Sequence, residues 1–197
     1  LNVDYVMANT AIPTGWWRSV YNTQNAFVHE CFVDEMATAA GKDPYEFRKA
    51  HLEKSPRLLA VLNLAAEKAG WGKPLPKGRF RGIACHMSFG SFVAEVVEIS
   101  VTEEGSIQVH RVVCAADCGI VINPDMLVAQ IQGAVTDGLG PTLKGRITIE
   151  NGQVQQGNFD DYEITKMDET PVVEVHVVPS AENPTGIGEP GLPPIAP

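Results

Sequence analysis

Long apolar runs and a signal peptide are both missing from this sequence. Basic residues are scarce as well: 15 Lys and Arg stand against 24 Asp and Glu, and the formal net charge is -9. Because nucleic-acid-binding surfaces are basic, this balance argues against a nucleic-acid partner, and the lack of an apolar run argues against a membrane span. An initiator methionine is also missing. The sequence begins with Leu1, which predicts a processed, cleaved or partial chain.

Cysteine is scarce, and its spacing argues against a metal cluster. The four cysteines are Cys31, Cys85, Cys114 and Cys118. The last two form a C-x3-C pair, whereas zinc and iron–sulfur sites usually have C-x2-C spacing. We therefore expect buried free thiols and no iron–sulfur cluster in this chain.

The first part of the chain, residues 1–72, is predicted to form a strand over 1–10 and then a helical lobe. The predicted helices cover residues 22–40, 44–52 and 56–69. We expect Asn22 or Thr23 to cap the first helix, whose apolar residues spread nearly all round and predict a well-buried element. Its histidine and carboxylates are interpreted as a solvated or salt-bridged face, not a metal site: His29, Glu30, Asp34 and Glu35.

The second part, residues 73–197, follows a short Gly/Pro-containing linker and is predicted to be β-rich. The predicted strands cover residues 81–88, 92–101, 107–115 and 171–179. Asn123 and Pro124 start a predicted helix, and Asn151-Gly152 marks a hairpin turn. These segments indicate an α+β fold with mixed sheets and packed helices. The 197 residues are enough for one domain with a proper core or for two small lobes.

One ionisable side chain, Glu189, lies in the stretch Gly-Ile-Gly-Glu-Pro-Gly-Leu-Pro-Pro at 186–194. The prolines fix φ and remove backbone donors, and the glycines allow a ligand to approach the main chain closely. A carboxylate on such a stiff loop has the fixed position that a general base needs. The alternative is a surface turn rich in Gly and Pro with a solvated glutamate.

Two further segments carry groups suited to binding. Trp16, Trp17 and Arg18 are suited to an aromatic wall with a cationic head for an anion or a flat heterocycle, although core packing and a cation–π contact would also explain them. The Gly90-Ser91 junction presents backbone N–H groups that can hold a phosphate or a pterin ring, or it is a plain connection between strands.

Two glutamines flank the apolar stripe of the helix predicted after Pro124. They are Gln130 and Gln132, on opposite edges of that stripe. A glutamine amide beside an apolar face must find hydrogen-bond partners if it is buried. The alternative is that both are exposed.

These segments resemble, in the same order, the large subunits of molybdenum hydroxylases, the xanthine dehydrogenase and aldehyde oxidase family. The matching sequence segments are residues 16–18, 22–48, 115–140 and 158–194. Gly-Ile-Gly-Glu-Pro resembles the family's Gly-x-Gly-Glu-Pro loop, and Asp-Cys-Gly-Ile-Val-Ile-Asn-Pro…Ala-Gln-Ile-Gln-Gly resembles its Asp-x-Gly…Asn-Pro…Gln-x-x-Gly segment. These motifs most resemble those of the isoquinoline 1-oxidoreductase and bacterial aldehyde dehydrogenase branch. Because those large subunits are several times longer, the chain resembles only their C-terminal portion, part of a molybdopterin-binding domain.

The resemblance implies roles for particular residues. Glu189 would be the base that deprotonates a molybdenum-bound hydroxyl, Gln130 would hydrogen-bond the pterin, and Arg18 would line the molybdenum centre. The cofactor would also be lined by Gly90, Ser91, Phe92, Val93 and Gly188. The substrate pocket would include Trp16 and Trp17. No residue would bind molybdenum directly, because the pterin holds it. After Arg18 the family is usually Gly-rich, and Ser19-Val20-Tyr21 departs from that pattern.

By resemblance, the full enzyme oxidises N-heterocycles or aldehydes with water as the oxygen donor. Its cofactor would be molybdopterin in the cytosine dinucleotide form, and the implied partners are a [2Fe-2S] subunit and a complementary chain carrying the rest of the molybdenum domain. The compartment is left open between bacterial cytoplasm and periplasm. One alternative is a non-catalytic fragment or scaffold half that completes a molybdopterin site only with a second chain. Another is a hydrolase that pairs Glu189 with Asp160 or Asp161.

Overall fold

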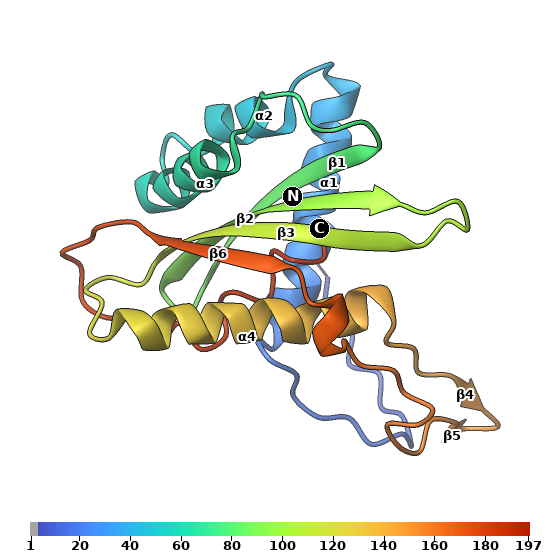
Figure 1. Ribbon diagram of the computed structural model, residues 1–197. Helices are drawn as coiled ribbons and strands as arrows, with labels where there is room; N and C mark the ends of the chain where they lie inside the picture. Colours follow the sequence, from blue (N-terminus) through green and yellow to red (C-terminus); the bar gives the residue numbers. More distant parts are fainter. Residues whose placement is uncertain (1–3) are drawn as a thin grey trace.

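In the computed structural model, residues 4–197 are described, and they form a four-stranded sheet with helices on both faces and a small separate hairpin (Figure 1). The strands of the main sheet, in the spatial order β1-β2-β3-β6, are β1 (Arg79–Ser88), β2 (Ser91–Val101), β3 (Ile107–Asp117) and β6 (Val172–Val177). β1, β2 and β3 pair antiparallel, whereas β6 pairs parallel to β3. The predicted α+β class is confirmed.

The helices are α1 (Tyr21–Ala39), α2 (Pro44–His51), α3 (Pro56–Ala69) and α4 (Pro124–Leu143). Successive strand residues point to opposite faces of the sheet. Accordingly, Val96 of β2 packs in one core with Leu62 of α3, and Val93 of β2 packs in the other core with Ile131 of α4. α3 therefore shares a core with the sheet. The division of the chain into residues 1–72 and 73–197 remains a prediction. Within residues 4–197, no helix is both long and apolar enough to cross a membrane.

Local signals in the sequence account for several element boundaries. The Asp43 carboxylate accepts the N–H groups of Tyr45 and Glu46 at 2.9 and 3.1 Å and so caps α2. Asn123 caps α4 in the same way, and Gly70 closes α3 in the left-handed conformation. The predicted turn at Asn151-Gly152 joins β4 (Ile149–Glu150) to β5 (Gln153–Val154), as expected.

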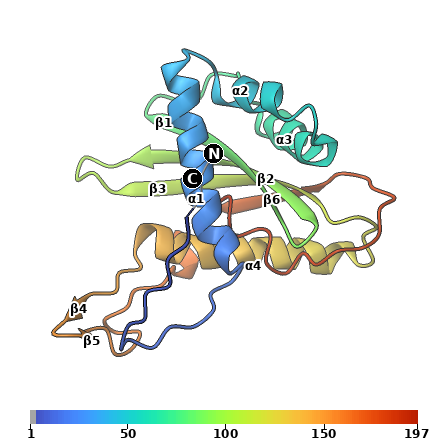
Figure 2. The same cartoon turned by 180° about the vertical axis from the view of Figure 1, so that it is seen from behind.

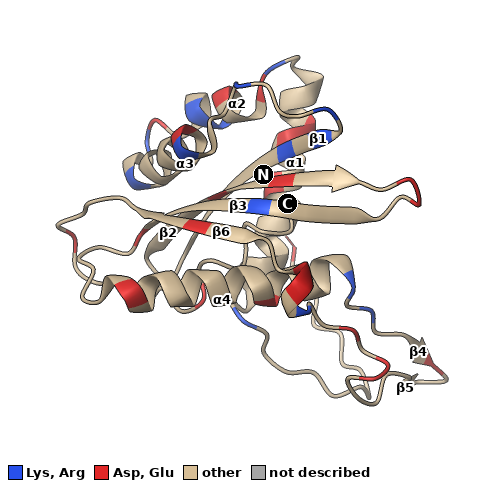
Figure 3. Ribbon diagram, viewed as in Figure 1, with Lys and Arg blue, Asp and Glu red and all other residues tan. Residues whose placement is uncertain are grey.

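Basic side chains gather on α2, on α3 and beside β1, with acidic residues between them (Figure 3). Two surface pairs in this region are Lys49 with Glu46, at 3.6 Å, and Lys68 with Glu67, at 3.4 Å. Mixed signs of this kind give a solvated surface and not a field of one sign. A short 3-10 helix, η1 (Met167–Glu169), precedes β6.

The strand predicted over 1–10 is wrong for the part that can be described. Residues 4–10 have no regular structure, and residues 1–3 lie outside the described part of the chain. Alternating apolar and polar residues form a strand only when a neighbour completes the hydrogen bonds, and neither sheet within 4–197 pairs with this segment. Tyr5, Val6 and Met7 are accordingly exposed.

The predicted cap of α1 is also wrong. The helix begins after Val20 and has no side-chain cap. Asn22 and Thr23 lie inside the first turn, where their side chains donate to the carbonyls of Ser19 and Arg18 at 3.1 and 3.0 Å. They therefore tie α1 to the turn that precedes it.

The prediction of a well-buried α1 is overturned as well. Its exposed apolar residues are Tyr21, Phe27, Val28, Phe32 and Met36. The buried stripe includes Ala26, Glu30 and Ala37. Glu30 is salt-bridged to the buried Arg48 at 2.8 Å and accepts the N–H of Cys85 in β1 at 3.0 Å. Figure 2, seen from behind, shows α1 lying across the molecule in front of the sheet. These apolar side chains of α1 are therefore left uncovered by residues 4–197.

Candidate functional site

The chain reaches Glu189 from β6 through an extended segment that is fastened to the end of β3. The N–H of Thr185 donates to the carbonyl of Cys118 at 2.8 Å. Gly119, with φ +76°, lies so close to this segment that a Cβ would be 2.2 Å from the carbonyl oxygen of Asn183. Only a glycine permits this approach, so Gly119 fixes the path of the chain toward Glu189.

The end of β3 is held in turn by an ion pair with α3. Both oxygens of the buried Asp117 accept from Arg57, each at 2.7 Å. The Arg57 hydrogen bonds hold the pKa of Asp117 below its usual value, despite the opposing effect of burial. The Arg57 guanidinium also lies over the ring of Phe92, 4.5 Å from its centroid. Phe92 is therefore covered by α3.

Arg18 joins two distant segments to the loop that precedes α1. Its Nε donates to the carbonyl of Gly188 at 2.8 Å, and one Nη donates to that same carbonyl. The same Nη also donates to the backbone carbonyl and the side-chain Oε1 of Gln130 in α4, each at 3.2 Å. The other Nη lies 3.6 Å from Asp137 Oδ2. A planar guanidinium with several fixed donors is suited to holding three acceptors at once.

Glu189 is half-buried beside this arginine. Its Oε1 accepts the backbone N–H of Ser19 at 3.2 Å, and its carbonyl accepts the Ser19 hydroxyl at 2.6 Å. Oε2 receives no donor from the described residues, so it is available to a reacting proton. On the far side, Gly191 packs tightly against α4, where a Cβ would be 2.9 Å from Ile131 Cδ1. The structure thus brings together four residues singled out in the sequence: Arg18, Gln130, Gly188 and Glu189.

The turn that carries Ser19 is strained. Ser19 has φ 70° and Val20 has φ 51° with ψ -128°, although neither is a glycine. The N–H of Asn22 donates to the carbonyl of Ser19 at 3.0 Å, which places Val20 at the first central position of a turn whose angles match type II′. Glycine dominates that position, and a β-branched residue there is an outlier. A Gly-rich segment would suit this turn, because glycine adopts these angles without strain. Ser19 and Val20 adopt them at a cost in backbone free energy.

Gly90 and Ser91 contact the start of the loop that carries Glu189, at Thr185 and Gly186. The Ser91 hydroxyl bonds the Thr185 hydroxyl and the Gly186 carbonyl, both at 2.7 Å. Gly90 has φ +79°, and its carbonyl accepts from Thr185 at 3.3 Å. Val93 is fully buried in the core under α4. Ser91 begins β2, so the predicted junction is one residue off, and the turn is Phe89-Gly90.

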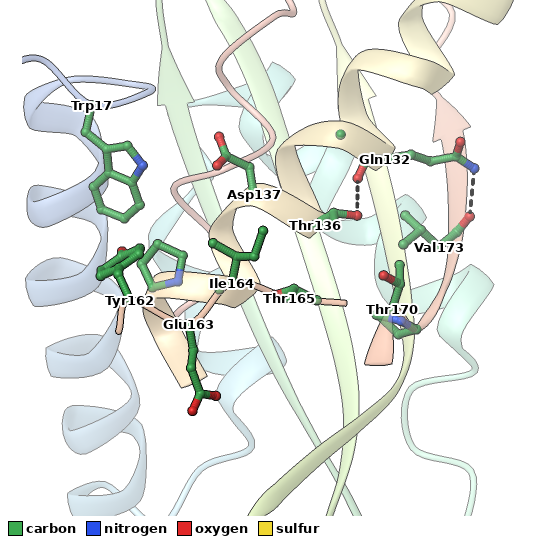
Figure 4. Close-up of a pocket in the computed structure, with 14 residues that line it drawn as sticks. Trp17, Gln132, Thr136, Asp137, Tyr162, Glu163, Ile164, Thr165, Thr170 and Val173 are labelled. Carbon is green, nitrogen blue, oxygen red and sulfur yellow. Dashed lines mark hydrogen bonds between the residues drawn. The ribbon is translucent and has the colours of Figure 1, made fainter. Parts of the chain in front are cut away.

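The two tryptophans have different surroundings. Trp16 is 93% exposed, whereas Trp17 is 41% exposed and lines a cavity of about 770 Å³ along α4. Figure 4 shows the Trp17 indole and the Tyr162 ring on the same side of this cavity, with Asp137 next to Trp17. Sequence reasoning did not single out Asp137 or Tyr162 as site residues. They come from the helix and from the polar loop after β5, and only packing places them together.

The pairing of Glu189 with Asp160 or Asp161 finds no support in the contacts. Asp161 accepts the N–H groups of Gly157 and Asn158 at 2.9 to 3.0 Å, within its own loop. The backbone N–H of Asn158 is the main cause of a lowered Asp161 pKa. Asp161 therefore shapes that loop.

Glu95 is a buried carboxyl that sequence reasoning missed. It is fully buried in β2, and neither of its oxygens has a hydrogen-bond partner among the described residues. Burial raises its pKa to about 8, so the carboxyl is mostly neutral at pH 7. It borders a cavity of about 240 Å³ formed with Leu139 and Ile195. The signal was present in the sequence as a single charge in the run Phe92-Val93-Ala94-Glu95-Val96-Val97.

Comparisons with known proteins agree with this architecture. A family model described as a molybdopterin cofactor-binding domain matches residues 33–171, a range that includes Gln130 and ends before Glu189. The beta subunit of isoquinoline 1-oxidoreductase from Brevundimonas diminuta is 32% identical over 99% of this chain, which spans 26% of that protein. One of the nicotinate dehydrogenase subunits of Pseudomonas putida is 32% identical over 90% of this chain, which spans 16% of that protein.

A solved structure shares the fold over most of the chain. Aldehyde oxidoreductase from Desulfovibrio gigas superposes with a TM-score of 0.69 over 89% of this chain and 38% of its own, at 12% identity. At that identity the likeness shows the fold alone. The chain therefore has the architecture of one part of a larger protein and spans about a quarter of the length of its Brevundimonas relative.

Proposed function

This chain belongs to the molybdopterin cofactor-binding domain family, and from that premise we propose that it forms the part of a molybdenum hydroxylase that sets a glutamate base, Glu189, beside the cofactor. The full enzyme would oxidise an N-heterocycle or an aldehyde with water as the oxygen donor. The observation that carries the proposal is the convergence of Arg18, Gln130 and Glu189. Arg18 bonds Gln130, which lies 112 residues away, and its neighbour Ser19 bonds Glu189, which lies 170 residues away.

The groups at this convergence fit a planar, hydrogen-bonding cofactor. Gln130 is exposed, and its Oε1 is taken by Arg18, while its side-chain NH₂ has no acceptor among the described residues. Gly186 has open space where a Cβ would stand, so a ligand can approach the main chain there. Gln130, Arg18 and Gly188 would hold the cofactor, and Gly90, Ser91, Phe92 and Val93 would support the loop.

The described residues 4–197 contain no group of three or more His, Cys, Asp and Glu placed to bind a metal ion. A metal at this site would need to bring its own ligands, as molybdenum does when a pterin holds it. When bound, molybdopterin would supply the metal and its two-electron chemistry, and the cytosine dinucleotide form is the one we propose.

The protein's own contribution would be a positioned base. Ser19 holds one oxygen of Glu189 through its backbone N–H, which leaves Oε2 to accept the proton released during hydroxylation. Arg18 holds the preceding carbonyl, at Gly188, and so limits the positions that this carboxylate can take. Fixing the base in advance avoids an ordering cost during the reaction.

Further polypeptide is part of the proposal. Tyr21, Val28, Phe32 and Met36 are exposed and recur at helical spacing along one side of α1, and Phe27 is exposed on a neighbouring side. Exposed apolar surface of this kind marks interaction sites. We propose that it is covered by a complementary chain that carries the rest of the molybdenum domain, and that a separate [2Fe-2S] subunit takes the electrons. A second candidate, a non-catalytic scaffold half, is kept because this chain spans only 26% of a full relative.

The test is a metal assay on the chain co-purified with a polypeptide that supplies the missing part of the large subunit. Retention of molybdenum, measured by mass spectrometry, supports the enzyme, and its absence under every condition supports the scaffold. The chain offers a matched pair of variants. Gln130→Leu removes the free amide beside Arg18 and should lower molybdenum content several-fold. Gln132→Leu should leave it unchanged, because within residues 4–197 the Gln132 amide donates only to the Val173 carbonyl, at 3.4 Å.

A further inference from the structure

Glu95 in β2 is a buried carboxyl that lacks a hydrogen-bond donor. Its side chain is fully buried, and neither oxygen has a hydrogen-bond partner within residues 4–197. An unpaired buried carboxyl costs free energy, because it has lost its water and nothing replaces that water. Buried polar atoms of native proteins are almost always hydrogen-bonded. Glu95 therefore indicates a donor that the described residues do not supply.

The strands on either side of β2 offer no substitute for that donor. Glu95 pairs with Ala84 of β1 and with Cys114 of β3 in the register of the sheet. Directly opposed residues of antiparallel strands point to the same face, so these two side chains flank Glu95. The alanine side chain has no polar atom, and a thiol is only a weak donor. The donor must therefore come from the space above this face of the sheet.

That space is a cavity of about 240 Å³, which Glu95 borders. Its other walls are mainly aliphatic and include Leu139 of α4 and Ile195 of the last residues. Ile107 and Leu143 also line it and are 49% and 39% exposed. The cavity therefore reaches the molecular surface, and a group from another molecule can enter it there.

A guest that fits this cavity has an apolar stem and a head with two donors. Aliphatic walls accept the methylene stem of a long basic side chain. A guanidinium donates two parallel N–H bonds to the two oxygens of one carboxylate, whereas an ammonium acts as a point charge. A guanidinium is also the more weakly hydrated of the two, so it loses less when it enters an apolar cavity. The two unpaired oxygens of Glu95 thus favour a guanidinium.

We propose that the Glu95 cavity receives the guanidinium of an arginine from the polypeptide that carries the rest of the large subunit. The present chain spans 26% of its Brevundimonas relative, so a subunit of that length has further polypeptide from which such a side chain can come. Since both oxygens are covered, Glu95 turns into the cavity when the guanidinium binds. The identity of the donating polypeptide rests on the function proposed above, whereas the preference of the cavity for a guanidinium does not.

The first test uses the 197-residue chain and two probes of similar shape. n-Butylguanidinium carries the proposed head on an apolar stem, and n-butylurea is its neutral analogue. Binding is measured by calorimetry and by NMR shifts of residues that line the cavity. Glu95→Gln should raise the Kd of n-butylguanidinium about tenfold, the effect of lost hydrogen bonds to a charged group. The Kd of n-butylurea should stay unchanged.

Two further variants serve as controls for this test. Glu103→Gln removes one negative charge from an exposed turn and should leave the Kd of both probes unchanged. Ala196→Leu narrows the cavity from its wall without altering the carboxyl, and should weaken both probes. Thermal unfolding shows whether each variant keeps its fold. The preference for a guanidinium is overturned if n-butylguanidinium does not bind at millimolar concentration, or if Glu95→Gln and Glu103→Gln change its Kd equally.

The second test uses the chain co-purified with the polypeptide that supplies the missing part of the large subunit. An arginine of that polypeptide should fill the cavity, so the assembled pair should no longer bind n-butylguanidinium. Glu95→Gln should weaken the association of the two chains about tenfold, because the arginine loses its carboxylate. If the pair binds the probe as well as the free chain does, the polypeptide is not the source of the guanidinium, and the inference is wrong.

Molybdenum content separates this inference from the proposed function. If the pair retains molybdenum and still binds n-butylguanidinium, only the inference about Glu95 fails. If the pair excludes the probe and never retains molybdenum, only the proposed function fails.

Discussion

The backbone N–H of Ser19 donates to the Glu189 carboxylate at 3.2 Å, although 170 residues separate the two in the chain. The Ser19 hydroxyl returns a second bond, at 2.6 Å, to the carbonyl of Glu189. Two bonds between the same residues set both the backbone and the side chain of the glutamate. The turn before α1 is therefore a support for the loop that carries the proposed base.

Glu189→Gln should keep the fold and the molybdenum content of the assembled enzyme while lowering turnover by about 10²- to 10⁴-fold, the usual contribution of a positioned general base. The amide oxygen can still accept the Ser19 N–H, but it cannot take a proton at neutral pH. Steady-state turnover and metal content are measured on the same preparation. Glu182→Gln, an exposed position in the segment leading to the loop, is the control. Turnover that stays within twofold in Glu189→Gln would remove Glu189 from the mechanism.

Val20→Gly should raise the free energy of unfolding by about 1–2 kcal/mol, because Val20 adopts φ 51° and ψ -128°, angles open mainly to glycine. The gain is partly offset by the greater freedom of glycine in the unfolded chain. Urea denaturation provides the measurement. Val28→Gly, in the exposed interior of α1, should lower the same quantity by about 1 kcal/mol. If both variants lose stability, the turn is not strained in the way described.

Gly119→Ala should destabilise the protein by about 2–4 kcal/mol, because a Cβ would be 2.2 Å from the Asn183 carbonyl oxygen and the backbone has φ +76°. Gly105→Ala separates the two causes. Gly105 has φ +85° but nothing within 4 Å of its Cβ position, so it reports the backbone strain alone. Equal losses in the two variants would show that the contact with Asn183 contributes nothing.

Glu95 should make stability depend on pH. Its pKa is raised by burial from 4.5 to about 8, so between these values the folded state keeps a proton that the unfolded chain has lost. The free energy of unfolding therefore falls as pH rises through this window, by up to about 1.4 kcal/mol per pH unit. Below pH 4.5 Glu95 is protonated in both the folded and the unfolded state, so the free energy of unfolding no longer depends on its titration.

Glu95→Gln cannot ionise and should remove that slope. Between pH 5.5 and 7.5 the wild-type chain should lose about 2–3 kcal/mol more than the variant, as measured by urea denaturation at each pH. Glu103→Gln, on the exposed turn between β2 and β3, should retain the wild-type slope. Matching slopes in wild type and Glu95→Gln would show that Glu95 is solvated or paired in solution.

The sequence alone determined the features that depend on neighbouring residues. Asp43, Asn123 and Gly70 mark helix ends because capping and left-handed closure act within one turn. Apolar periodicity located the strands of the main sheet to within about two residues. The sequence motifs gave the family resemblance, which the family match over residues 33–171 confirms.

Tertiary structure decided what depends on contacts between distant segments. The strand expected at the N-terminus has no partner in the described chain, and α1 keeps an apolar face that sequence periodicity could not distinguish from a buried one. The bonds of Arg18 to Gly188 and Gln130, and of Ser19 to Glu189, join segments 112 to 170 residues apart. No local pattern encodes such pairs, because the packing of α4 and the path set at Gly119 bring them within hydrogen-bond distance.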